Sequence, residues 1–174
     1  MEITAGMVKA LREETGAGIM DCKRALSDTS GDVEKAKAIL REKGLASAAK
    51  KESRETSQGL VEVYIHGAGR IGAMVELNCE TDFVARTDEF KGLARDIAMQ
   101  VVAQSPRFIS PELAPPEVVD AEGLTEADLK SASLTTQDYF RDPKLSVGEK
   151  IKEVIAKSGE NIRIRRFERY ELGR

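Results

Sequence analysis

Histidine and cysteine are the side chains best suited to nucleophilic or metal chemistry near neutral pH, and this 174-residue sequence has one histidine and two cysteines. Cys79 with His66 would be a nucleophile and base of the Cys–His kind. The interpretation we favour is that Cys79 is a small packed hydrophobic residue. A lone His66 excludes a site with several histidine ligands, and Cys22 and Cys79 have no metal-ligand spacing, so no metal is expected.

Phosphate chemistry has no better support. The sequence contains no G-x-x-x-x-G-K-[ST] motif, and the Gly16–Gly18 and Gly67–Gly69 pairs are explained by turns. The acids of residues 120–128 fit a solvated face. We therefore expect no catalytic constellation and no cofactor, as in a protein that is not an enzyme.

The segment Thr81-Asp82-Phe83-Val84 has an unusual composition for its position. It places an aromatic residue beside an acid in a connection between an expected strand and an expected helix, where polar residues are usual. In one interpretation, Phe83 packs under the neighbouring hairpin as a hydrophobic staple. In the other, Phe83 is a wedge that inserts into a partner protein. Both stay open at this point.

The elements that position these residues begin with three short helices in residues 1–45. Thr4 is expected to cap the first helix and Asp32 the third, and Gly44 is expected to end the third. The apolar positions of the three helices are Val8, Leu11, Ile19, Met20, Cys22, Ala25, Leu26, Val33, Ala36, Ile39 and Leu40. So small a core fits a docking module better than a catalytic one.

Residues 46–58 have no apolar stripe and are interpreted as a charged linker or helical extension. A core domain over 59–174 follows. Its residues 60–65 and 71–77 alternate in polarity around a glycine-containing turn, which predicts a hairpin. A long amphipathic helix, capped by Thr87, comes next.

Four prolines and seven acids against one lysine mark residues 105–140 as a surface excursion, with a short helix near Thr125. A capping box at 146–149 opens another helix. Residues 161–172 return to a period of two, with Ile162, Ile164, Tyr170 and Leu172 in one phase. These elements predict an α+β fold with a three-stranded antiparallel sheet and flanking helices.

Charge and hydropathy restrict the partners. Lys and Arg number 27 against 30 Asp and Glu, a net charge of −3, which argues against a protein that binds nucleic acid by bulk electrostatics. The arginines of 163–169 keep an RNA-binding module as the alternative function. There is no signal peptide and no apolar run of membrane-spanning length, and the cysteine usage fits a reducing compartment, so a cytoplasmic location is expected.

Three segments resemble signatures of one family. Leu11–Leu26 (LREETGAGIMDCKRAL) is similar to the N-terminal signature of bacterial translation elongation factor Ts. Glu76–Arg86 (ELNCETDFVAR) resembles the second signature, and 159–172 resembles the last strand of the family. The order is also that of the family, and residues 105–140 are the least characteristic part.

The resemblance implies a guanine-nucleotide exchange factor for elongation factor Tu. It implies a ubiquitin-associated-like three-helix head that docks on the partner GTPase through positions matching Ile19, Met20 and Lys23. The Thr81–Val84 loop matches the segment that displaces the Mg²⁺ of the partner, with Phe83 as the wedge. Ile19 stands where many members have Met, a swap of similar volume. The chain resembles the short form of the family, which has one core half.

The same resemblance, together with the sheet, predicts a homodimer that binds two copies of the partner. A sheet of three strands with two helices leaves a face or an edge uncovered. Phe167 falls in the arginine phase of the last strand, where a solvated face would not favour it. A second copy would cover such a surface by two-fold symmetry. In the alternative, the chain is a monomer and residues 105–140 fold back over the sheet.

Overall fold

A computed structural model describes residues 2–174. Over these residues the chain forms two compact units, one of residues up to Arg54 with Lys152–Asn161, and one of Glu55–Ile151 with Ile162–Arg174. The division into a head of residues 1–45, a linker of 46–58 and a core of 59–174 remains a prediction.

The first unit begins with three helices, α1 (Ala5–Thr15), α2 (Ile19–Asp28) and α3 (Val33–Ala49). Thr4 and Asp32 cap α1 and α3 as predicted, because their side chains accept hydrogen bonds from the N–H groups of Met7 and Lys35. The core that holds the helices together consists of Val8, Leu11, Cys22, Ala25, Leu26, Ala36 and Leu40.

The predicted end of the third helix at Gly44 is wrong, since α3 continues to Ala49. Gly44 has another use there. A Cβ atom at this position would lie 3.1 Å from the Cβ of Ala156, so the missing side chain lets helix α8 (Val147–Ser158) approach closely. Val33 and Ile39, assigned to the inner face, are partly exposed on α3.

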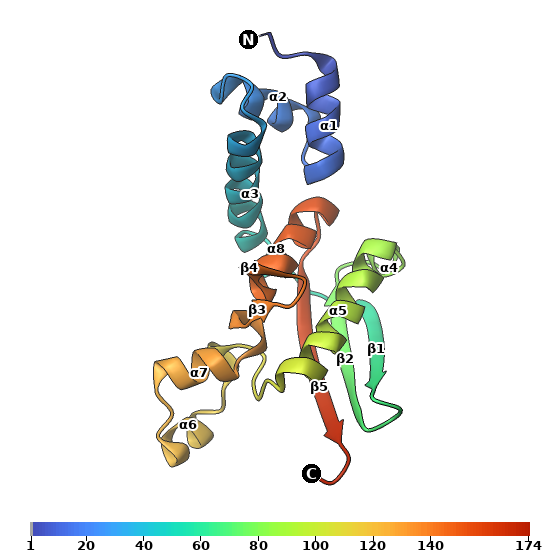
Figure 1. Ribbon diagram of the computed structural model, residues 1–174, viewed down its shortest axis with the longest axis vertical. Coiled ribbons are helices and arrows are strands. Elements are labelled where there is room, and N and C mark those ends of the chain that lie inside the picture. The colour runs from blue at the N-terminus through green and yellow to red at the C-terminus, as the bar shows by residue number, and fades with distance from the viewer. Residues whose placement is uncertain (1) are drawn as a thin grey trace. The chain divides into compact units, whose positions relative to one another are not determined.

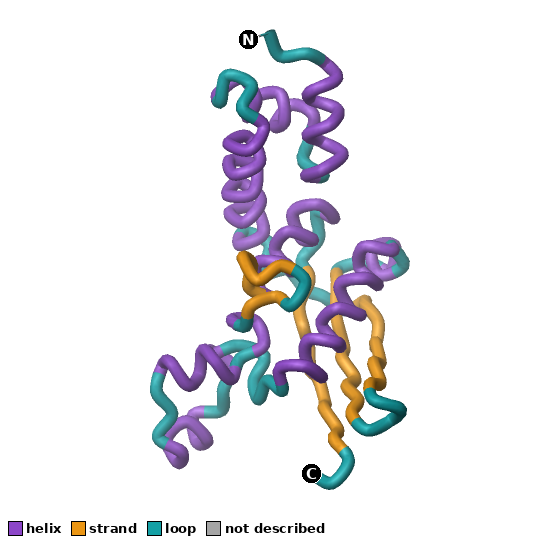
Figure 2. The backbone as a smooth tube through the Cα atoms, in the orientation of Figure 1, coloured by secondary structure: helices purple, strands orange, loops and turns teal. Residues whose placement is uncertain are grey.

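The second unit contains a three-stranded antiparallel sheet of order β1-β2-β5, with β1 Gln58–His66, β2 Ile71–Cys79 and β5 Ile162–Glu171 (Figures 1 and 2). The predicted hairpin is confirmed, and positive φ angles at Gly67, Ala68 and Gly69 form its turn. Helix α5 (Asp88–Gln104) packs on β1 and β2, with Thr87 as its cap and Phe90, Leu93, Ala94, Ile97 and Val101 buried.

The phase predicted for the last strand is wrong beyond its middle. Arg166 pairs with Glu76 but Ile164 pairs with the next residue, Leu77, so Arg165 is an extra residue in a β-bulge. The bulge moves Phe167 to the α5 side, where it is half-buried beside Val75. It moves Tyr170 to the opposite face, where its side chain is exposed, and Leu172 beyond the strand is exposed too.

Residues 105–140 have more structure than a surface excursion. They contain a 3-10 turn (Pro111–Leu113), α6 (Pro116–Glu122), α7 (Glu126–Ala132), a second 3-10 turn (Leu134–Thr136) and the start of the ribbon β3 (Asp138–Tyr139) with β4 (Asp142–Ser146). The helix predicted near Thr125 is α7, which opens with a capping box of Thr125 and Asp128. Leu134 and Tyr139 are buried, so the segment also contributes to the core.

Candidate functional site

The Thr81–Val84 loop is folded as the start of a short helix, α4 (Asp82–Ala85). Thr81 caps this helix, since its hydroxyl accepts from the N–H of Val84 at 3.4 Å. The buried thiol of Cys79 donates to the Thr81 carbonyl at 3.1 Å, and Ala85 is buried at the far end of the helix. The loop is therefore held at both ends by groups in the fold.

Phe83 projects from this held segment into solvent. Its side chain is 78% exposed, although an aromatic ring of this size gains about 2–3 kcal/mol from complete burial. The staple interpretation is therefore wrong, because Phe83 does not pack under the hairpin. Because the backbone of this segment is already held, binding of the exposed ring to a partner would not need to order the segment.

Asp82, the neighbour of Phe83, is oriented by an ion pair that the sequence interpretation missed. Its Oδ2 atom lies 2.7 Å from a guanidinium nitrogen of Arg86, four residues later on the same short helical segment. The i, i+4 spacing was a readable signal for this pair. The carboxylate thus lies on the surface beside the exposed ring and is only partly free to turn.

The three docking residues predicted on the head also form one surface. Ile19 and Met20 open α2 and are 54% and 68% exposed, while Cys22, Ala25 and Leu26 face the core. Lys23 follows Ile19 by one helical turn and is exposed as well. The head thus presents two apolar side chains and one cation together. The Thr81–Val84 loop belongs to the other compact unit.

The Cys79–His66 nucleophile pair is excluded by the strand register. Cys79 lies opposite Gln58 at one end of the hairpin, and His66 lies opposite Ile71 at the other. The eight residue-to-residue steps from Ile71 to Cys79 separate the two ends by roughly 26 Å, at about 3.3 Å per step. His66 instead shares a 3.0 Å hydrogen bond with the Tyr64 hydroxyl.

Residues 2–174 contain no group of three or more His, Cys, Asp or Glu side chains arranged to hold a metal ion. No helix among these described residues is both long enough and apolar enough to cross a membrane.

Comparison with known proteins agrees with the signatures. The family model "Elongation factor TS" matches residues 24–137. The chain is 51% identical to elongation factor Ts of Carboxydothermus hydrogenoformans, over 98% of this chain and 89% of that protein. It is 49% identical to the protein of the same name from Heliobacterium modesticaldum, over 98% of this chain and 90% of that protein. It is 47% identical to elongation factor Ts of Coprothermobacter proteolyticus, over 99% of this chain and 100% of that protein.

The chain belongs to the elongation factor Ts family. The alignments cover 98–99% of this chain and 89–100% of these relatives, and they run over 194 or 196 positions, so the relatives have residues that this 174-residue chain lacks. The matched range includes Thr81–Val84, whereas Ile19, Met20 and Lys23 precede it and are covered by the pairwise comparisons.

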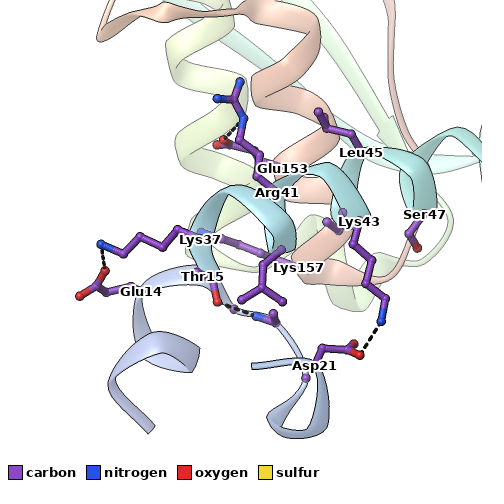
Figure 3. A pocket seen from close by; sticks show the side chains of 16 residues that line it. Glu14, Thr15, Asp21, Lys37, Arg41, Lys43, Leu45, Ser47, Glu153 and Lys157 are labelled. Carbon is purple, nitrogen blue, oxygen red and sulfur yellow. Dashed lines mark hydrogen bonds and ion pairs between the residues drawn. The ribbon is translucent and has the colours of Figure 1, made fainter. Parts of the chain in front are cut away.

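A cavity of about 400 Å³ in the first unit lies among the α1–α2 turn, α3 and the end of α8 (Figure 3). Each carboxylate lining it is already bound to a cation. Glu14 lies 2.5 Å from Lys37, Asp21 lies 2.5 Å from Lys43, and Glu153 lies 3.7 Å from Arg41. These ion pairs hold the three carboxylates that line the cavity in place.

The face of the sheet opposite α5 carries a second apolar surface, which we call the outer sheet face. The strand register places five exposed apolar side chains on it: Val61, Val63, Ile65, Met74 and Tyr170. Arg166 and Glu76, paired at 2.7 Å, border them on the same face. Residues 105–140 do not cover these side chains, contrary to the folding-back alternative.

Proposed function

We propose that this protein is a guanine-nucleotide exchange factor for elongation factor Tu, acting in the cytoplasm during protein biosynthesis. The head, a ubiquitin-associated-like module, docks on the partner GTPase through Ile19, Met20 and Lys23. Phe83 and Asp82 then enter the partner near its nucleotide, displace Mg²⁺ and promote GDP release and GTP loading. The observation that carries the proposal is the exposure of Phe83 on a capped helical turn.

The physical basis is a coupling of two binding equilibria. Mg²⁺ requires near-ideal octahedral geometry, so a small displacement of its ligands costs much binding energy. A wedge that displaces these ligands weakens the partner's affinity for GDP, and by reciprocity GDP weakens the binding of the wedge. No covalent step is needed. A protein of this kind requires a rigid contact surface and no catalytic side chain.

We also propose that the 59–174 core is a dimerisation domain and that two copies bind two copies of elongation factor Tu. The outer sheet face supports this proposal, because soluble monomers rarely expose a large contiguous apolar patch. A two-fold axis would pair this face with the same face of a second copy. The interface would be non-covalent, since Cys22 and Cys79 are both buried.

Reciprocity gives a direct test of the exchange proposal. Calorimetric titration would measure the dissociation constant of this protein for elongation factor Tu, once without nucleotide and once with saturating GDP and Mg²⁺. We expect GDP and Mg²⁺ to raise the dissociation constant at least tenfold. Equal dissociation constants in both conditions would contradict the coupling, because a ligand that does not distinguish the two states cannot promote release.

A further inference from the structure

Asn161 is a buried polar residue that none of the proposed contacts uses. It is 2% exposed and lies in the turn between α8 and β5. Its amide nitrogen donates to the carbonyl of Glu52 at 3.1 Å and to that of Arg54 at 2.8 Å. One side chain thus holds two backbone groups of a segment more than a hundred positions earlier in the sequence.

The segment held by Asn161 is the exit of the chain from the head. Helix α3 ends at Ala49, and residues 50–54 form turns in which Lys51 N–H donates to Ala48 and Arg54 N–H to Lys51. Residues 55–57 then lead to β1 without regular structure. The chain has no other regular element between the head and the sheet strand β1, so the turn fixes where this connection begins.

Two further contacts of the same unit involve residues that shortly precede Asn161 in the sequence. Ala156 of α8 packs at Gly44 of α3, and Glu153 pairs with Arg41. These contacts hold the middle of α3, whereas Asn161 holds the residues after its end. The residues Lys152–Asn161 are therefore part of the compact unit formed by the head.

We propose that Asn161 is a positioning residue for nucleotide exchange, which clamps the 50–54 turn and shortens the unrestrained connection between the head and β1. The proposal rests on the exchange function, because it assumes that the head and Phe83 must engage one partner together. Linked contacts help each other through effective concentration, which falls as the link becomes longer and looser.

The expected size of the effect follows from chain statistics. Without the clamp, the unrestrained connection grows from three residues (55–57) to eight (50–57). A flexible chain spans about 5.5 Å times the square root of its length, so the span grows from roughly 10 to roughly 16 Å. The accessible volume of this connection then rises about fourfold, which is an upper limit for the loss of effective concentration because α8 still holds α3 at Gly44 and Arg41.

Two variants separate the hydrogen bonds from mere packing. Asn161→Ala removes the side chain, whereas Asn161→Asp keeps its shape and replaces the N–H donors by a carboxylate that the two carbonyls repel. The turn carries Lys50, Lys51 and Arg54, so trypsin reports its opening directly. We expect both variants to be cleaved at these residues at least threefold faster than the parent protein, with cleavage after the exposed Lys130 of α7 as the internal control.

The second readout is GDP release from elongation factor Tu at increasing concentrations of each variant. We expect the half-saturating concentration to rise up to fourfold while the maximal rate stays unchanged. Asn161→Ser, which is too short to reach both carbonyls, replaces either variant that fails to fold by circular dichroism.

The outcomes separate this proposal from the exchange function. Unchanged cleavage of the turn in both variants would overturn the clamp. Parent-like behaviour of Asn161→Asp alone would also overturn it, because packing would then suffice. Faster cleavage with no shift in half-saturation would overturn the positioning role. If the parent protein itself does not accelerate GDP release, the exchange function fails, and the positioning role fails with it even where cleavage shows the clamp.

Discussion

Replacing Phe83 by alanine should separate stability from function. The Phe83 side chain is 78% exposed in the free protein, so only roughly a fifth of it is covered. Complete burial of a phenylalanine contributes about 2–3 kcal/mol, so the loss of folding stability should be about 0.5 kcal/mol. The remaining four-fifths, about 2 kcal/mol, becomes available only in the complex. A loss of that size lowers the second-order rate of GDP release about 30-fold.

The assay is the release of a fluorescent GDP from elongation factor Tu, with thermal unfolding of the variant followed by circular dichroism. Leu113→Ala is the matched control, since Leu113 is also an exposed apolar side chain but lies in another segment. Asp82→Ala should lower the rate less than Phe83→Ala, because an exposed carboxylate contributes little. An unchanged release rate in a folded Phe83→Ala protein would refute the wedge. A larger loss for Asp82→Ala would reverse the order of the two residues.

Three further predictions concern the head, the outer sheet face and the stability of the fold at acid pH. Lys23→Glu should raise the dissociation constant for elongation factor Tu about tenfold without lowering the unfolding temperature, whereas Lys130→Glu should leave the dissociation constant unchanged. Equal dissociation constants for the two variants in calorimetry would remove Lys23 from the interface. The parent protein should have a mass of about twice the 19.0 kDa chain by light scattering. Val63→Glu places a charge on the outer sheet face and should halve this mass, while Leu113→Glu should leave it unchanged. A constant mass of 19.0 kDa for the parent protein would contradict the dimer. Hydrogen bonding to Arg107 lowers the pKa of Glu122 below its ordinary 4.5, so this carboxyl stabilises the fold above pH 4.5 and loses that contribution as the pH falls through its folded value. The unfolding temperature should therefore drop less between pH 5 and pH 3 in Glu122→Gln, and an identical drop would show that the pair adds nothing.

Local rules were enough to predict most of the elements. The caps at Thr4, Asp32 and Thr87 were readable because each is a short polar side chain before an apolar period. The hairpin followed from the alternation of 60–65 and 71–77 around two glycines. In both cases, the deciding interaction lies within a few residues along the chain.

The errors came from contacts between distant segments. Glycine is typical of helix ends, but the role of Gly44 depends on its contact with Ala156, more than a hundred residues later. The phase of β5 depends on an extra residue opposite β2, which alternation within one strand cannot reveal. Asn161 gave no signal at all, because its partners are backbone carbonyls that every sequence contains.

The candidate site was predictable in its residues and less so in its geometry. An aromatic residue in a polar connection marked Phe83, but only the structure decides between a buried staple and an exposed wedge. The short helix α4 decides it, because its cap and its buried Ala85 turn the ring outward.

The central claim is that binding of this protein expels nucleotide from elongation factor Tu, and stopped-flow release of a fluorescent GDP tests it most directly. Purified elongation factor Tu loaded with the labelled GDP is mixed with excess unlabelled GDP, with and without this protein. We expect the release rate to rise in proportion to the concentration of this protein and then to saturate as the complex fills. A release rate equal to the spontaneous one at every concentration, with a stable complex present, would contradict the account.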